Sequence, residues 1–227
     1  MTGFLSRFGP RRDAEPDATP DSVGVDRDPV LGTKALKKFI ASLRSRPSPV
    51  VLDLGPVVGS NISFFGEQLG CKIFVEDVFA DLDRHQREKR LGDFPKFLGT
   101  RFPQAEGSVD GILCWDVFDF LDKASAQALA DRLSRVLAVN GALFGFFGTA
   151  RPAESRFTKF VVVDDQNLRH RAYSTPRMKQ AVLQNRDIIR LFERLRVSDS
   201  FLLHTHVREL LFRKPEYLAQ QAPDGGR

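Results

Sequence analysis

The sequence predicts an α/β protein with a doubly wound, mostly parallel sheet and antiparallel strands at its C-terminal end. Short apolar runs at 50–55, 71–77, 110–115 and 142–148 alternate with segments of helical periodicity. These runs are apolar on both sides, as expected for parallel strands covered by helices on both faces. Beyond residue 155 the pattern becomes strand-rich, which favours antiparallel strands at one edge of that sheet.

The composition indicates one globular domain with short extensions. The chain has 227 residues, of which 42% are hydrophobic and 28% charged. Residues 1–31 contain four prolines and no sustained apolar period, so we expect a disordered N-terminal arm. The domain is expected at 32–215 and a flexible tail at 216–227. No apolar run reaches the roughly 20 residues of a membrane span, and no signal-peptide pattern opens the chain. We therefore expect a cytoplasmic protein with Cys71 and Cys114 reduced.

In the first half, each element has a local signal. Apolar residues at helical spacing predict a helix over 33–46, which prolines then end. The strand at 50–55 leads to a helix capped by Ser60 or Asn61 and ended by Gly70. A strand at 71–77 and a charged helix with an Asp83–Arg87 pair follow. No strand can be placed in 91–107.

The second half begins with 110–121, an apolar strand that runs into a turn. A helix through Leu137 is expected to close at Asn140-Gly141, before the strand at 142–148. The segments 158–165 and 168–174 predict a hairpin around residues 164–167. A helix capped by Asn185 and two final strands complete the domain.

The loop after the first strand carries the clearest chemical signal. Gly55 directly follows a buried strand, so backbone can approach a ligand closely there. About twenty residues later, Glu76 or Asp77 ends the second strand, where an acid can accept hydrogen bonds from ribose hydroxyls. A dinucleotide fingerprint would need further glycines at the positions of Val57 and Ser60. The pattern thus favours a nucleoside, held differently from a dinucleotide.

Several segments together resemble a known family. VLDLGPVVG at 51–59 is similar to the first-strand motif VLDLGxGxG of class I S-adenosylmethionine-dependent methyltransferases, and VDGILCWDVFDFL at 109–121 to their fourth strand. LAVNGAL at 137–143 resembles their LxPGGxL segment, and RELLFRKP at 208–215 their final strand. The resemblance runs over roughly residues 50–215 and implies a Rossmann-like methyltransferase fold with S-adenosylmethionine as cofactor.

The resemblance also implies which residues would bind the cofactor: Asp53, Gly55, Pro56, Gly59, Asn61, Glu76, Asp77 and Trp115. Two positions depart from the family. Val57 replaces the middle glycine, where an isopropyl group could crowd the methionine part of the cofactor. The family acid that holds the adenine amino group has only Asp93 as a counterpart in 91–107.

Trp115 and Asp116 are the catalytic candidates, because they follow the fourth strand at the mouth of the expected crevice. Trp115 could stack on substrate or adenine, and Asp116 could orient an amine or accept a proton. The alternatives are a packed tryptophan and a helix-capping aspartate. Methyl transfer to an aligned nucleophile can proceed by proximity alone, so the lack of a catalytic triad is no objection.

Arg169, Arg171 and Tyr173 alternate onto one strand face, with His170 on the other. In the family, the segment after the fifth strand often covers the substrate, so this face suggests recognition of a carboxylate or phosphate. A solvated strand face is the alternative. The net charge of +6 over residues 151–227, against −4 over 51–150, is compatible with an anionic small-molecule acceptor.

Other functions are less well supported. His204 and His206 would share one side of a strand but have no third ligand, so no metal site is expected. A nucleic-acid methyltransferase would need a continuous positive stripe, and no RNA-binding module is visible. A catalytically inactive methyltransferase fold that binds a protein partner is the main alternative to the enzyme, since the glycine motif is incomplete.

Overall fold

The computed structural model describes residues 28–150, 156–176 and 182–216, which form two sheets and the helices around them. The strands are β1 (Val30–Gly32), β2 (Val50–Asp53), β3 (Lys72–Val75), β4 (Val109–Trp115), β5 (Leu137–Gly148), β6 (Arg156–Val162), β7 (Asn167–Pro176), β8 (Arg196–Leu202) and β9 (Val207–Arg213). The helices are α1 (Leu36–Arg44), α2 (Gly59–Ile62), α3 (Val78–Arg87), α4 (Phe94–Thr100), α5 (Lys123–Val136) and α6 (Asn185–Leu191). A π-helical segment η1 (Ser63–Gln68) and 3-10 turns η2 (Leu91–Asp93) and η3 (Val117–Phe120) complete the set.

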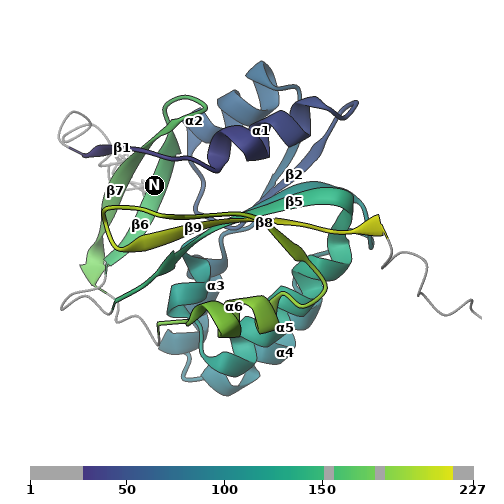
Figure 1. Ribbon diagram of the computed structural model, residues 1–227. Helices are drawn as coiled ribbons and strands as arrows, with labels where there is room; N and C mark the ends of the chain where they lie inside the picture. The colour runs from purple at the N-terminus through teal and green to yellow at the C-terminus, as the bar shows by residue number, and fades with distance from the viewer. Residues whose placement is uncertain (1–27, 151–155, 177–181, 217–227) are drawn as a thin grey trace, which may run out of the picture.

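The six-stranded sheet has the order β3-β2-β4-β5-β9-β8. β3, β2, β4 and β5 are parallel, whereas β9 and β8 are antiparallel to their neighbours. This confirms the predicted doubly wound sheet with antiparallel strands at its C-terminal end. The parallel strands read as continuous apolar runs because helices cover both faces, with α1 and α2 on one side and α3 to α6 on the other (Figure 1).

α1 packs on the sheet through Leu36, Phe39, Ile40 and Leu43, all fully buried. Burial of side chains of this size contributes about 1.5–3 kcal/mol each. The helix approaches β4 so closely that a Cβ on Gly111 would lie 2.8 Å from the side chains of Leu43 and Phe39. The absence of a side chain at that position therefore allows α1 to lie directly on the sheet.

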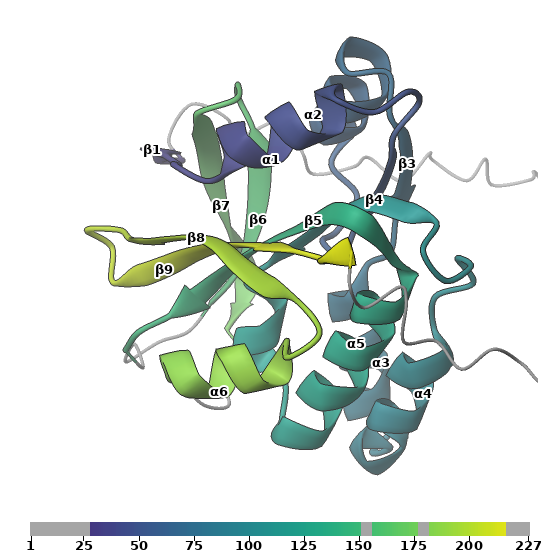
Figure 2. The same cartoon turned by 45° about the vertical axis from the view of Figure 1, so that its right-hand side comes forward.

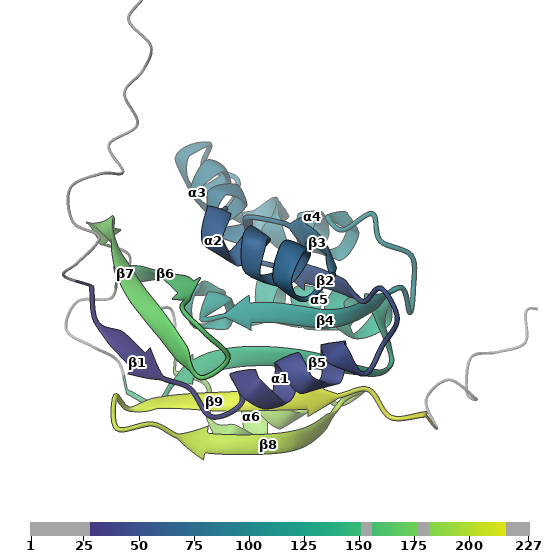
Figure 3. The same cartoon turned by 90° about the horizontal axis from the view of Figure 1, so that it is seen from above.

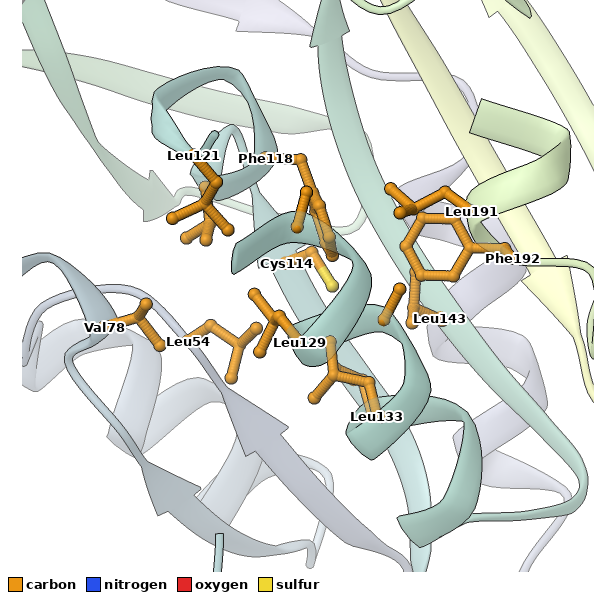
Figure 4. Packing of buried hydrophobic residues seen from close by; sticks show 14 of the residues in the cluster. Leu54, Val78, Cys114, Phe118, Leu121, Leu129, Leu133, Leu143, Leu191 and Phe192 are labelled. Carbon is orange, nitrogen blue, oxygen red and sulfur yellow. The ribbon is translucent and has the colours of Figure 1, made fainter. Parts of the chain in front are cut away.

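The opposite face forms the larger apolar cluster. α3, α5 and α6 bring leucine, valine and phenylalanine side chains together beneath β4 and β5, as the close view in Figure 4 shows for Leu54, Cys114, Leu129 and Phe192. The abundant phenylalanines serve mainly this packing, with Phe192 in ring contact with Phe118. Both cysteines are free and buried.

The predicted hairpin forms as β6 and β7, but it does not join the main sheet. It pairs with β1 in a separate three-stranded sheet of order β1-β7-β6, which stands beside α1 and α2 (Figures 2 and 3). Only β8 and β9 extend the edge of the main sheet. Val30 and Leu31, which the sequence placed in the disordered arm, pair with Arg169 and Leu168 as part of β1. The rest of the arm up to residue 27 lies outside the described chain, as does the tail beyond Glu216.

Some local predictions were wrong. α5 ends at Val136, and Asn140-Gly141 forms a bulge inside β5, where Asn140 has φ +60° and its N–H donates to Lys214 O. The cap of α2 is Val58, with no side-chain hydrogen bond, so neither Ser60 nor Asn61 caps it.

The predicted N-cap of α6 was also wrong. Gln184, rather than Asn185, occupies that position. Segment 91–107, for which no strand was predicted, contains η2 and α4. Among the residues that the structure describes, no helix is long and apolar enough to cross a membrane.

Candidate functional site

The carboxyl ends of three adjacent parallel strands bring the predicted site residues to one edge of the sheet. Asp53, the last residue of β2, pairs in register with Val75 of β3 and Leu113 of β4. The glycine loop, residues 54–59, therefore starts beside Glu76 on one side and Trp115 on the other. This is where ligands bind in open α/β sheets, in the crevice beyond the strand ends.

The glycine loop leaves its outer part open. The side chain of Val57 is 62% exposed, so the isopropyl group does not fill the hollow that the sequence placed there. A Cβ added at Gly59 would meet no atom within 4 Å. Pro56 is buried beneath the loop. Packed protein groups therefore do not occupy the space at Val57 and Gly59.

The inner part of the loop contacts Trp115. A Cβ on Gly55 would lie 2.8 Å from Cδ1 and 2.9 Å from Nε1 of the indole. Trp115 is 2% exposed and stacks on Phe160 of β6, with ring centroids 5.2 Å apart and planes 10° from parallel. The structure therefore shows the packed tryptophan that the sequence left as an alternative to a stacking platform.

Asp53 is buried at the base of this contact. Its Oδ1 accepts hydrogen bonds from the Gly55 N–H at 2.9 Å and from Trp115 Nε1 at 2.6 Å. Burial removes water from the carboxylate and raises its pKa to about 6, which outweighs the two hydrogen bonds that favour the charged form. A buried carboxylate of this kind favours a cationic partner.

Glu76 lies at the end of β3 as predicted, but other protein groups bind its carboxylate. Its Oε2 accepts a hydrogen bond from Arg101 Nη1 at 2.5 Å, and its Oε1 accepts one from Gln104 Nε2 at 3.5 Å. Arg101 also donates to Asp81 at 2.7 Å. Asp77 caps α3 by accepting the Ala80 N–H, so it is not placed to bind ribose in this structure.

Arg101 and Gln104 are site residues that the sequence did not reveal. Both belong to the segment after α4 that lacks periodicity, so only the tertiary structure places them beside Glu76. Gln104 is largely buried, and its Oε1 has no hydrogen-bond partner in the structure. Asp93, by contrast, contacts Arg90 on the surface.

Asn61 follows the loop but bonds to the hairpin. Its Nδ2 donates to Phe160 O at 2.9 Å, and its Oδ1 accepts the Val162 N–H at 2.8 Å. Because Asn61 is 2% exposed, both interactions are shielded from water. The Asn61 amide therefore joins α2 to β6.

The side of β7 that was predicted to bind the substrate does not face the other site residues. His170 meets the Phe160 ring edge to face, with centroids 4.9 Å apart and planes at 74°, and the buried Leu168 lies on the same side of β7. Arg169 and Arg171 alternate onto the opposite side, and Arg171 Nε binds Asp28 at 3.1 Å. The structure therefore does not bring these arginines to Asp53 or Glu76. The Tyr173 side chain lies outside the described residues.

The remaining candidates are placed as follows. Asp116 is buried at the start of η3 and makes no side-chain capping bond there. His204 and His206 lie in the β8–β9 turn rather than on one strand face. In the described ranges, no cluster of three or more His, Cys, Asp or Glu could hold a metal ion. An open pocket of about 520 Å³ lies between Gly32, Gln166 and Leu203; His204 lines it, but none of the predicted cofactor or substrate residues does.

Comparison with solved structures gives methyltransferases of low sequence identity. The glycopeptide N-methyltransferase MtfA complexed with S-adenosyl-L-methionine aligns at 14% identity and TM-score 0.48, over 88% of this chain and 100% of that chain. A Burkholderia thailandensis 1,6-didemethyltoxoflavin-N1-methyltransferase with bound S-adenosylhomocysteine aligns at 18% identity and TM-score 0.44, over 80% and 79%.

A Pyrococcus horikoshii OT3 protein aligns at 14% identity and TM-score 0.48, over 80% and 92%. No protein-family model and no curated protein matches the chain.

Proposed function

We propose that this protein is an S-adenosylmethionine-dependent methyltransferase that acts on a small-molecule acceptor. The observation that carries the proposal is the buried Asp53 carboxylate between the glycine loop and the end of β4. A desolvated carboxylate favours a positively charged ligand group, and this cofactor carries both an ammonium and a sulfonium. Glu76 at the neighbouring strand end supplies acceptors for ribose hydroxyls.

The residues fit such a ligand at the outer part of the site. Val57 points outward and Gly59 is open, so backbone is accessible along the loop. At the inner part, Trp115 lies against Gly55 and bonds to Asp53 Oδ1, so a ligand takes over that oxygen from the indole only when the indole moves. When bound, the cofactor would supply an electrophilic methyl group to an aligned nucleophile. Asp116, beside Trp115, is our candidate for orienting the acceptor.

Titration calorimetry with S-adenosylmethionine and S-adenosylhomocysteine tests this proposal. We expect micromolar binding that is weakened by Glu76→Gln and by Gly59→Leu. Glu88→Gln removes an exposed carboxylate elsewhere on the surface and Gly92→Leu adds the same side chain at another open glycine, so both should bind like the wild type. Gly55 is unsuitable for this test, because a side chain there would strike Trp115 in the free protein. The proposal is contradicted if the folded wild type gives no heat at millimolar ligand and a folded variant without Trp115 gives none either.

A binding module without cofactor is the second candidate, and specific contacts favour it. Trp115 covers Gly55, and Arg101 pairs with Glu76, so protein groups already use the positions that a cofactor would need. On this alternative the fold presents a surface to a protein partner. It predicts no binding of S-adenosylmethionine or S-adenosylhomocysteine even after Trp115 is removed, whereas the methyltransferase predicts that binding persists.

A further inference from the structure

We infer that Trp115 is a built-in plug, which closes the crevice by taking the space before Gly55 and the hydrogen-bond acceptor of Asp53 that a cationic ligand needs. The inference rests on the proposed function and adds a conformational step to it. In the closed state the indole N–H bonds to Asp53 Oδ1; in the open state the ammonium group of the ligand bonds to the same oxygen.

The backbone aims the indole at this position. The β4–β5 register shifts between Leu113 and Trp115, which marks a bulge at the end of β4. Trp115 itself has φ +50°, a left-handed conformation that is uncommon for a bulky residue. Bulges beside functional sites redirect side chains, and unusual backbone persists where the surroundings enforce it. Here both features direct the indole against Gly55, where only a glycine leaves room for it.

β6 holds the plug from the other side. The Phe160 ring lies flat against the indole and also stacks on Phe146, with centroids 4.9 Å apart. The Asn61 amide joins this strand to α2 through its bonds to Phe160 and Val162. Movement of Trp115 therefore requires the β6 contact to loosen, which couples the indole to the strand that covers the crevice.

On this inference, ligand entry replaces the indole N–H of Trp115 by the ammonium group of the ligand as the hydrogen-bond donor to Asp53 Oδ1. Asp53 now receives a neutral indole N–H, although burial makes its charged form unfavourable. A hydrogen bond from a cation is stronger than one from a neutral donor, especially where water is excluded. Once bound, an ammonium group therefore makes a stronger hydrogen bond to Asp53 than the indole does.

Fluorescence tests the plug directly, because Trp115 is the only tryptophan of the chain. In the free protein we expect little quenching by acrylamide, since the indole is buried. Saturating S-adenosylhomocysteine should at least double the quenching constant. In calorimetry, Trp115→Phe should bind this ligand about 3- to 10-fold more tightly, because the competing N–H is gone and a net hydrogen bond has about that value. Phe212→Leu, which removes a ring from the other apolar cluster, should bind like the wild type.

The outcomes separate the plug from the proposed function. Ligand binding with unchanged quenching overturns the plug, whatever the affinity of Trp115→Phe, and leaves the methyltransferase standing. Binding by Trp115→Phe alone, with none by the wild type, supports a plug that stays closed. The absence of binding by both proteins overturns cofactor binding and the plug with it. The quenching measurement needs no variant, so it decides the question even if Trp115→Phe fails to fold.

Discussion

Replacement of Asp53 by asparagine should stabilise the protein at neutral pH. Asp53 is 2% exposed, and burial raises its pKa from 3.8 to about 6. Asparagine retains an acceptor oxygen for the Gly55 N–H and for Trp115 Nε1 but carries no charge. The variant therefore keeps the local hydrogen bonds and avoids the cost of holding an anion away from water.

The size of the effect follows from the pKa of Asp53. A shift from 3.8 to about 6 corresponds to about 3 kcal/mol at roughly 1.4 kcal/mol per unit. Between these pH values the folded protein keeps a proton that the unfolded chain has lost, so stability falls as pH rises. The full stabilisation is present below pH 3.8 and is lost as pH passes through about 6. The free energy of unfolding of Asp53→Asn, relative to wild type, should therefore rise by about 3 kcal/mol over this window.

Urea unfolding at about pH 3.5 and about pH 7.5 measures this difference, provided that the slopes with denaturant match. Glu106→Gln, which removes an exposed carboxylate from a loop, serves as the matched control for the loss of one acidic side chain. The reasoning is refuted if the difference between Asp53→Asn and wild type stays constant with pH, or if the variant loses stability as pH rises.

The remaining predictions concern packing and buried polar groups. Gly55→Ala should lower the free energy of unfolding by about 1–3 kcal/mol, because its Cβ would overlap Trp115. The Cβ of Gly59→Ala meets no atom, so this variant should lower the free energy of unfolding by less than about 0.5 kcal/mol. Equal effects of the two variants in urea unfolding would contradict this reasoning. Glu209→Ala leaves the buried hydrogen-bond donors at the start of α1 without their acceptor, so circular dichroism should report a stability loss of about 2–4 kcal/mol, and a neutral result would refute that role. Burial raises the pKa of Cys114 well above its ordinary value, so its thiol should resist a thiol reagent at pH 8 until urea unfolds the chain, and rapid labelling of the native protein would show that the site is open.

Much of the fold was predictable because its signals are local. The apolar runs of β2 and β4 and the helical spacing in α1 identify a parallel sheet covered on both faces. Prediction failed where tertiary contacts outweighed a local preference. Asn140-Gly141 has the composition of a helix end, but hydrogen bonds with Lys214 hold it in the β5 bulge. Asn61 is a residue type that often caps helices, but its side-chain amide bonds to the backbone of β6 instead.

For the candidate site, too, the positions of the main residues were predictable, whereas their contacts were not. Strand order alone brings Asp53, Glu76 and Trp115 to one edge, so their proximity followed from the sequence pattern. Their partners did not, because Arg101 lies in a segment without periodicity, and the β6–β7 hairpin pairs with β1 in a separate sheet that brings Phe160 against Trp115. A pattern of residue types does not specify which side chain fills a given space.

By itself, the sequence determined the architecture and the edge of the sheet at which chemistry would occur, since hydrophobic periodicity depends on residues close in the chain and right-handed crossovers restrict how parallel strands can be arranged. Only the tertiary structure decided the state of that edge: Val57 turns outward, and Trp115 closes the space before Gly55. The physical reason is that burial and hydrogen bonding at Asp53 depend on groups from β2, β4 and the overlying β6, which meet only when the chain is packed.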